Sequence, residues 1–305
     1  MKRFLLRRSL QSLLVVIGAI TLVFLVLRIA PGDPAILYAG PQATQQDIQA
    51  ARQTLGTDQP IIVQYLRFLG DVVRLDFGES YRLKDSAISL LVDRIPATLL
   101  LATTAICIAV ALGFSLGIWA GLTEGKAADT IISSLSLFGQ AAPNFWIGIV
   151  LIILFSAHLG FLPSSGYGRP EHLILPAITL ALPLIGLVTR LVRAGLIDVM
   201  EQPYIRAARA RGYAQSVVVW RHAIRNTLIP VVTVIGLQFG VLLEGSIVIE
   251  VVFAWPGIGR LLVDSVITRD YSVVQVTVLF IAIIFIVINI IVDILYAYLD
   301  PRVRI

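Results

Sequence analysis

The sequence predicts an all-α integral membrane protein with six transmembrane helices. Of the 305 residues, 57% are hydrophobic and 14% are charged, whereas about a quarter of the residues of a soluble domain are charged. Six stretches of at least 18 residues contain no charged side chain, and a helix needs about 20 apolar residues to cross the ~30 Å hydrocarbon core of a bilayer. The stretches are residues 9–27, 95–123, 130–168, 172–189, 226–243 and 271–292.

Residues 1–30 are expected to form a short cytoplasmic N-terminus and the first spanning helix. A secretory signal peptide is the alternative, because basic residues precede the apolar stretch. The apolar region of a signal peptide usually has about 7–15 residues, but this stretch has 19, and no small-x-small cleavage site follows it before Pro31. We therefore interpret it as a retained span.

Residues 31–94 are predicted to form a helical segment outside the membrane, on the periplasmic or extracellular side. Thr44 and Asp47 have the spacing of a capping box, and Gly56 is a typical helix end. A second helix is indicated by apolar residues at helical spacing. We expect it to pack against the rest of the protein rather than to lie flat on the membrane. These apolar residues are Ile62, Tyr65, Leu66, Leu69, Val72 and Val73.

Residues 95–305 are predicted to form a core of five further spans. The run 130–168 is long enough for two helices, but proline, serine and glycine fill its end. Such residues favour turns. We therefore expect one helix to about Ser156 and then an exposed loop.

Three glycines of the second span recur every fourth residue. Gly113, Gly117 and Gly121 predict a helix face that another helix backbone can approach closely. The letters GFSLG (113–117) also match a serine hydrolase motif, but that motif requires a strand-to-helix elbow. Cys107 is expected to be a small packing residue. An intramembrane enzyme would have only these candidates, so we predict no catalytic residue.

The sequence offers no metal site and no nucleotide site. Its three histidines are scattered, without a nearby cluster of cysteines or carboxylates at ligand spacing. The segment GLTEGKAADT contains Gly-Lys but lacks the upstream glycine and the Ser/Thr of a P-loop. We therefore expect no cofactor in this chain and no nucleic-acid partner. If ATP drives the protein, another chain hydrolyses it.

The distribution of cations predicts that both termini are cytoplasmic. Lys and Arg collect in short cytoplasmic segments because they resist translocation. With the N-terminus inside, the inner segments hold 14 of the 24 basic residues. Residues 31–94 hold six more together with eight acids, and this segment is long enough to fall outside the rule. Because the number of predicted spans is even, the C-terminus lies inside as well.

A cytoplasmic loop, residues 193–226, contains the stretch YIRAARARG (204–212). Pro203 favours a helix start and Gly212 a helix end, which predicts a helix of about two turns. Isolated helices below about 12–15 residues are marginal, so this one requires a partner surface. Its alanines keep it thin enough to enter a groove, and its arginines can bind carboxylates at the rim. The predicted docking residues are Tyr204, Arg206, Ala207, Ala208, Arg209, Ala210, Arg211 and Gly212.

This segment resembles the "EAA" loop of ABC importer permeases, whose short coupling helix docks in a cleft of the ATPase subunit. Ala207, Ala208 and Gly212 match the second, third and seventh positions of that motif, while Arg206 stands where the general motif has Glu. Seven further blocks resemble the B-type permease of the dipeptide/oligopeptide/nickel branch. They are APGDP (30–34), LGTDQPIIVQYLRFLG (55–70), DFGESY (76–81), LPSSGY (162–167), RHAIRNTLIPVVTVIGLQFG (221–240), EVVFAWPGIGRLLVDSVITRDY (250–271) and DILYAYLDPRVR (293–304).

The resemblance implies a type I ABC importer permease fold in a bacterial inner (plasma) membrane. It also implies a second homologous permease, two ABC ATPase subunits or one ATPase homodimer, and an extracytoplasmic substrate-binding protein as partners. ATP and Mg²⁺ would be bound by the ATPase subunits. Peptides are the expected substrates, and nickel chelates or glutathione-like compounds are the alternatives.

Polar residues inside the predicted spans are candidates for the substrate path. Glu244 lies about 27 Å of helix rise from Asn226 and hence near the outer boundary, and Gln238 precedes it by six residues. Both can face a wet cavity that receives a peptide amine. Gln140 and Asn144 in the third span are further candidates. A stand-alone secondary transporter or channel is the rival interpretation, but it would normally place several ionisable residues near mid-membrane.

Overall fold

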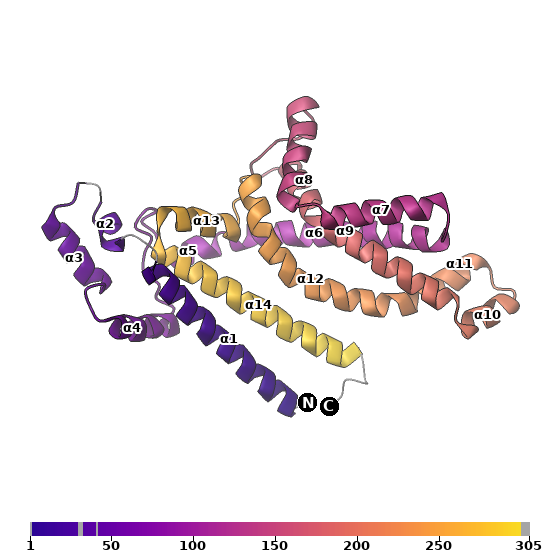
Figure 1. Ribbon diagram of the computed structural model, residues 1–305, viewed down its shortest axis with the longest axis horizontal. Helices are drawn as coiled ribbons and strands as arrows, with labels where there is room; N and C mark the ends of the chain where they lie inside the picture. The colour runs from indigo at the N-terminus through magenta and orange to yellow at the C-terminus, as the bar shows by residue number, and fades with distance from the viewer. Residues whose placement is uncertain (1, 30–32, 41, 300–305) are drawn as a thin grey trace. The chain divides into compact units, whose positions relative to one another are not determined.

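The structure is a computed structural model that describes residues 2–29, 33–40 and 42–299 (Figure 1). Within these ranges the regular elements are helices, accompanied by an isolated β-bridge between Glu79 and Ser86. The predicted all-α fold is therefore confirmed. The chain divides into a first unit, residues 1–96 and 257–287, and a second unit, residues 97–256 and 288–304.

The first unit contains short helices, one whole long helix and the first part of another. Phe24 of the first helix is buried and contacts the rings of Tyr65 and Phe68, with centroid distances of 5.2 and 5.8 Å. These aromatic contacts join the first long helix to the helix that the apolar spacing predicts. The helices are α1 (Lys2–Ile29), α2 (Pro34–Ala39), α3 (Gln45–Leu55), α4 (Ile61–Arg74), α5 (Ala87–Val92), α13 (Ile258–Thr268) and α14 (Tyr271–Leu299).

The helix signals of residues 31–94 are confirmed. The Asp47 amide donates to Thr44 Oγ1, and the Thr44 amide donates to Asp47 Oδ2 at 2.8 Å. Hydrogen bonds from the Thr44 side chain and backbone hold the pKa of Asp47 below its ordinary value. Gly56 ends α3 in the left-handed conformation, with φ of 66°, where a side chain would be strained.

Helix α4 packs only part of its apolar stripe. Tyr65, Leu69 and Val72 pack against the buried cluster that includes Phe24. Ile62 and Val73, in contrast, are 70% and 84% exposed. The expectation that this helix packs against the rest of the protein is therefore confirmed for one side of the stripe. A stripe wider than one helix contact leaves its outer edge uncovered.

The second unit is built around α9, which contacts α7, α8 and α12. Helix α6 approaches it closely, because a Cβ atom on Gly117 would lie 2.7 Å from the Thr189 carbonyl oxygen. Gly113 and Gly121 face α9 in the same way, so the predicted close-contact face is confirmed. The helices are α6 (Ile95–Leu122), α7 (Ala127–Ala141), α8 (Asn144–Leu151), α9 (Pro170–Met200), α10 (Pro203–Ala210), α11 (Gln215–Val217) and α12 (Ile224–Val252), with π-helical η1 (Ile152–His158) and η2 (Val218–Ala223).

The third apolar run is not one straight helix, which corrects the prediction. Helix α7 ends at Ala141, and the chain turns by 106° before α8 and η1 continue to His158. Ala142 is extended, with φ of −74° and ψ of 138°. Proline restricts the preceding residue to this region and cannot donate a helical hydrogen bond, so Pro143 explains the break.

Two further predictions on α6 have different outcomes. Cys107 is exposed, so its expected role as a packing residue is wrong. The motif GFSLG lies in the middle of a continuous helix, which excludes the elbow that a serine nucleophile requires.

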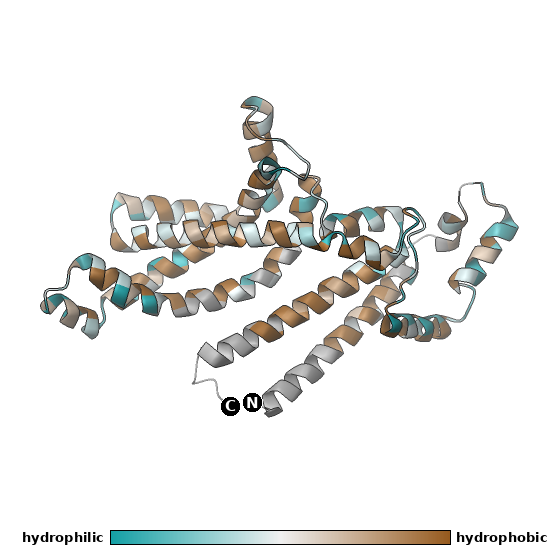
Figure 2. Ribbon diagram, turned by 180° about the vertical axis from the view of Figure 1, so that it is seen from behind, coloured by the Kyte–Doolittle hydropathy of each residue, from teal (hydrophilic) through white to brown (hydrophobic). Residues whose placement is uncertain are grey.

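Three helices among the described residues are long and apolar enough to cross a membrane, or up to five if each bent pair is one span. Figure 2 shows that the long helices are mostly apolar, while polar residues gather on α3, α4 and around α10 and α11. The membrane-spanning character is therefore clear. The count of six spans stays a prediction.

Candidate functional site

The predicted cytoplasmic helix is present with the expected bounds. Helix α10 runs from Pro203 to Ala210 with proline in its first turn. Arg211 follows as its C-cap, and Gly212 leaves the helix with φ of +81°. Proline at the start and glycine just past the end are the typical pattern of a short, sharply bounded helix.

One face of α10 packs onto the chain itself. Ile205 is fully buried and Ala208 is 7% exposed, and they are three residues apart and hence on one face. Their buried neighbours are Leu196 of α9 and Val218 and Ala223 of η2. Ala208 therefore packs on its own chain, and its contact with a partner stays a prediction. The helix obtains part of its order from its own chain, because a two-turn helix gains stability by burying an apolar face.

The opposite face of α10 is exposed. It retains the small residues Ala207 and Ala210. Arg206 donates from Nε and Nη2 to the carbonyl oxygen of Glu201, at 3.2 and 3.0 Å, which satisfies an orphan carbonyl at the end of α9. The other predicted docking residues that remain exposed are Tyr204, Arg209, Arg211 and Gly212.

Helix α9, which carries α10 at its end, is tied to α7 by an ion pair. Arg193 contacts Asp129 through Nε to Oδ1 at 2.5 Å and Nη2 to Oδ2 at 2.8 Å. Asp129 is 4% exposed and also accepts hydrogen bonds from the Gly125 amide and the Ser133 hydroxyl. A bidentate arginine–carboxylate pair fixes orientation as well as distance, so it holds α7 against the end of α9.

Three of the four predicted path residues line one cavity of about 140 Å³. They are Gln140 at the end of α7, Asn144 at the start of α8 and Gln238 of α12. The break between α7 and α8 places the first two on the same cavity. The fourth residue, Glu244, has a side chain outside the described residues. Apolar side chains complete the wall, namely Leu180, Pro183, Leu184, Val241 and Leu242.

Arg190 is exposed and brings a positive charge next to this cavity through a bond to one of its lining residues. Its Nη1 donates to Oε1 of Gln140 at 2.7 Å. Helices α7 and α9 are very close one turn before Arg190, because a Cβ atom on Gly186 of α9 would lie 2.3 Å from the carbonyl oxygen of Ser136 in α7. Arginines at membrane boundaries usually extend toward water, and this exposed one also contacts a residue that lines the cavity. Amide groups with a cation beside them can bind a carboxylate.

Sequence reasoning missed Arg190 and Asp129 as site residues. In the sequence, Arg190 is recognised only as one of the basic residues of the inner segments. Asp129 follows a glycine-containing turn and has no nearby residue that indicates its partner. In a single sequence no spacing signal connects residues that are 50 or 64 positions apart.

The family described as "Binding-protein-dependent transport system inner membrane component" matches residues 113–305. A companion family, described as the N-terminal part of such a membrane component, matches residues 1–102. The chain belongs to this family. It is a permease, the membrane component of an ABC importer, and it resides in the inner membrane.

Relatives of this permease match over its full length. A putative peptide transport system permease protein of Brucella abortus (strain 2308) is 42% identical over 312 residues, covering 100% of this chain and 99% of the relative. The glutathione transport system permease protein GsiC of Salmonella paratyphi A is 42% identical over 304 residues, with the same two coverages.

Two solved structures share the permease fold at 18% sequence identity. The inward-facing MetNI methionine ABC transporter has a TM-score of 0.59 and covers 70% of this chain and 97% of its own. An amino acid ABC transporter with histidines has a TM-score of 0.55 and covers 68% and 93%. In the described part of the permease, no group of three or more His, Cys, Asp or Glu residues is arranged to hold a metal ion.

Proposed function

We propose that this permease forms half of the membrane pathway of an ATP-driven peptide importer. The full-length likeness to peptide and glutathione permeases supports the substrate class. The pathway half is supported by the cavity at Gln140, Asn144 and Gln238, whose amide groups can donate and accept hydrogen bonds. A peptide backbone has both hydrogen-bond donors and acceptors, and side-chain amides can pair with both kinds whatever side chains the peptide carries.

The permease crosses the membrane six times in this proposal, with both termini in the cytoplasm. The spans are α1, α6, the bent pair α7–η1, α9, α12 and α14. The distribution of cations supports this orientation, since it assigns 14 of 24 basic residues to the inner segments. Residues 31–94 then lie outside, and α10 lies inside.

Coupling to ATP hydrolysis goes through the exposed face of α10. This is the observation that carries the proposal, because α10 combines an anchored face with a free face of alanines and arginines. A partner that moves the free face also moves Leu196 of α9, and it moves η2, which leads into α12. The ion pair of Arg193 with Asp129 passes the motion to α7.

The partners in this proposal are a second homologous permease, two ABC ATPase subunits or one homodimer, and an extracytoplasmic substrate-binding protein. ATP and Mg²⁺ are bound by the ATPase subunits. Catalytic and cofactor residues are not assigned to this chain. Glutathione-like peptides are the second substrate candidate, because GsiC is 42% identical.

The variant Ala207→Trp tests the coupling role. Ala207 is exposed on α10, so an indole fits without disturbing the core but blocks a close-fitting partner. We expect a folded permease that no longer co-purifies with the ATPase and shows no peptide-stimulated ATP hydrolysis. Ala50→Trp, at an exposed alanine of α3, is the matched control and should retain ATPase binding. Normal coupling in Ala207→Trp would contradict the proposal.

A further inference from the structure

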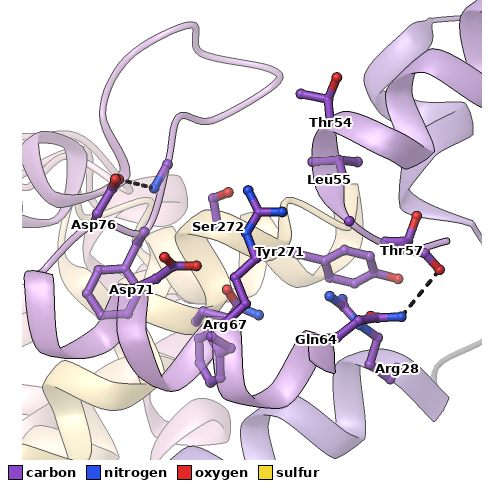
Figure 3. A pocket seen from close by; sticks show the side chains of 15 residues that line it. Arg28, Thr54, Leu55, Thr57, Gln64, Arg67, Asp71, Asp76, Tyr271 and Ser272 are labelled. Atoms are coloured by element: carbon purple, nitrogen blue, oxygen red, sulfur yellow. Dashed lines mark hydrogen bonds between the residues drawn. The ribbon is translucent and has the colours of Figure 1, made fainter. Parts of the chain in front are cut away.

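The first unit contains a second cavity, of about 280 Å³, that the proposed pathway does not use. Figure 3 shows it between the α3–α4 linker, helix α4 and the start of α14, with Arg67, Asp71 and Tyr271 among its lining side chains. All of these elements belong to one compact unit. The charges on its wall determine what it can bind.

Arg28 and Gln64 form a fixed part of the wall. Arg28 Nε donates to Gln64 Oε1 at 2.7 Å. Gln64 Nε2 donates to the carbonyl oxygens of Gln59, at 2.7 Å, and Thr57, at 3.3 Å. These bonds hold the α3–α4 linker against α4 and α1. The function of Gln64 is therefore structural, since its amide nitrogen and oxygen both have partners.

Arg67 is different, because its guanidinium has unused donors. It lies against Gly56, where an added Cβ atom would be 2.9 Å from Nη1. An arginine at this position can bind the last carbonyl groups of a helix. Two of those of α3 already have donors, since Gly56 and Thr57 donate their amides to the carbonyls of Gln53 and Arg52. Within the described residues, Arg67 has no ion-pair or hydrogen-bond partner.

Asp71 is half-buried on the same helix, four residues after Arg67. Opposite charges at this spacing often pair on a helix surface, but no ion pair joins these two in the described part of the chain. Both line the same cavity (Figure 3). One wall therefore presents a cation and a carboxylate that do not neutralise each other.

We propose that this cavity binds a small zwitterion, a free amino acid or a dipeptide. Arg67 binds the carboxylate, Asp71 binds the ammonium group, and Tyr271 forms the opposite wall. Pockets for drug-sized ligands have volumes of about 300–1,000 Å³, so a cavity of about 280 Å³ suits a ligand no larger than a dipeptide. This site is separate from the cavity at Gln140. Only its location on the outer side rests on the proposed function.

The test is a calorimetric titration of the purified transporter complex, without binding protein, with Ala-Ala, its N-acetyl derivative and its C-terminal amide. Each bond to a charged group is worth about a tenfold change in affinity, so blocking either end should weaken binding about tenfold. Arg67→Gln should make Ala-Ala and its amide bind equally, and Asp71→Asn should make Ala-Ala and its acetyl derivative bind equally. The control Arg74→Gln, an exposed cation at the end of α4, should keep both differences.

The wild-type ligand series needs no variant, so a folding defect cannot mask the result. Equal binding of the free and blocked dipeptides, or no binding of Ala-Ala, would overturn the site. Arg190→Gln separates it from the membrane cavity, because the outer site should keep the differences between Ala-Ala and its blocked derivatives in this variant, whatever happens at the cavity near Gln140. If binding is lost in Arg190→Gln and kept in Arg67→Gln, the outer site is refuted while the proposed pathway stands. Conversely, peptide uptake that does not depend on ATP would refute the proposed function, while the result of this titration would still stand.

Discussion

Arg193 of α9 holds Asp129 of α7 in a two-point ion pair, with contacts of 2.5 and 2.8 Å. Asp129 is buried, and its oxygens also accept bonds from the loop that precedes α7 and from Ser133. The pair lies one turn before Leu196, the residue of α9 on which α10 packs. It is therefore one of the contacts that tie the end of α9, on which α10 packs, to α7.

Removing one member of this pair should be costly. Asp129→Ala leaves the Arg193 guanidinium, whose side chain is 30% exposed, without its carboxylate, and the loss of a hydrogen bond to a charged group costs about 1.5–3 kcal/mol. We expect a marked fall in the thermal unfolding temperature of the purified permease. Asp264→Ala is the control, because Asp264 forms an exposed pair with Arg260 at 3.6 Å, and such pairs contribute about 0–1 kcal/mol. An equal fall in unfolding temperature in Asp129→Ala and Asp264→Ala would contradict the role of the Arg193–Asp129 pair.

Gly117→Ala should separate α6 from α9. The added methyl group would lie 2.7 Å from the Thr189 carbonyl oxygen, and overpacking of this kind costs about 1–3 kcal/mol. Gly18→Ala, where nothing lies within 4 Å, should be neutral or slightly stabilising, because alanine favours helices. The stability of both variants is measured by thermal unfolding and by the yield of monodisperse protein. A tolerated Gly117→Ala would show that the helices can move apart freely.

Ser80→Ala should loosen the loop between α4 and α5. Its hydroxyl donates to the buried carboxylate of Asp270, and Tyr81 donates to the Thr268 carbonyl oxygen nearby. Leaving a buried carboxylate without its donor costs about 1–3 kcal/mol or more. We expect faster proteolytic cleavage within residues 76–86. Ser89→Ala, outside this contact, is the comparison, and the same cleavage rate in both would argue against the anchor.

Arg190→Gln should change peptide selectivity. The proposed pathway loses its cation beside Gln140, so uptake of peptides with a free carboxylate should fall about tenfold. Uptake of C-terminal amides should be unchanged. Lys126→Gln removes an exposed cation away from the cavity and should affect neither. A uniform loss for all peptides in Arg190→Gln would indicate a structural role instead.

Local signals in the sequence predicted local structure correctly. The capping box at Thr44, the bounds of α10 and the left-handed Gly56 each depend on residues within one or two turns. The glycine face of α6 was also predictable, because a four-residue repeat of a residue without a side chain has one main use in a spanning helix. The polar residues Gln140, Asn144 and Gln238 were predicted as path residues, and the structure brings them to one cavity.

Features that depend on distant residues were not predictable. The inward turn of Ala208 depends on Leu196 and η2, which offer a groove on the chain itself. The uncovered edge of α4 at Ile62 depends on how much of the stripe α1 can cover. The 106° turn at Pro143 has a local cause, but composition alone treats the run as continuous, since hydropathy does not report backbone geometry.

The central claim is that the outer face of α10 is covered by the ATPase. The direct measurement is maleimide modification of Ala207→Cys in a background with Cys107→Ser, which removes the single native thiol. We expect rapid modification in the isolated permease and strong protection after the ATPase subunits are added. Ala208→Cys should be modified slowly in both states, because the chain itself covers it. Equal modification of Ala207→Cys with and without the ATPase would contradict the claim.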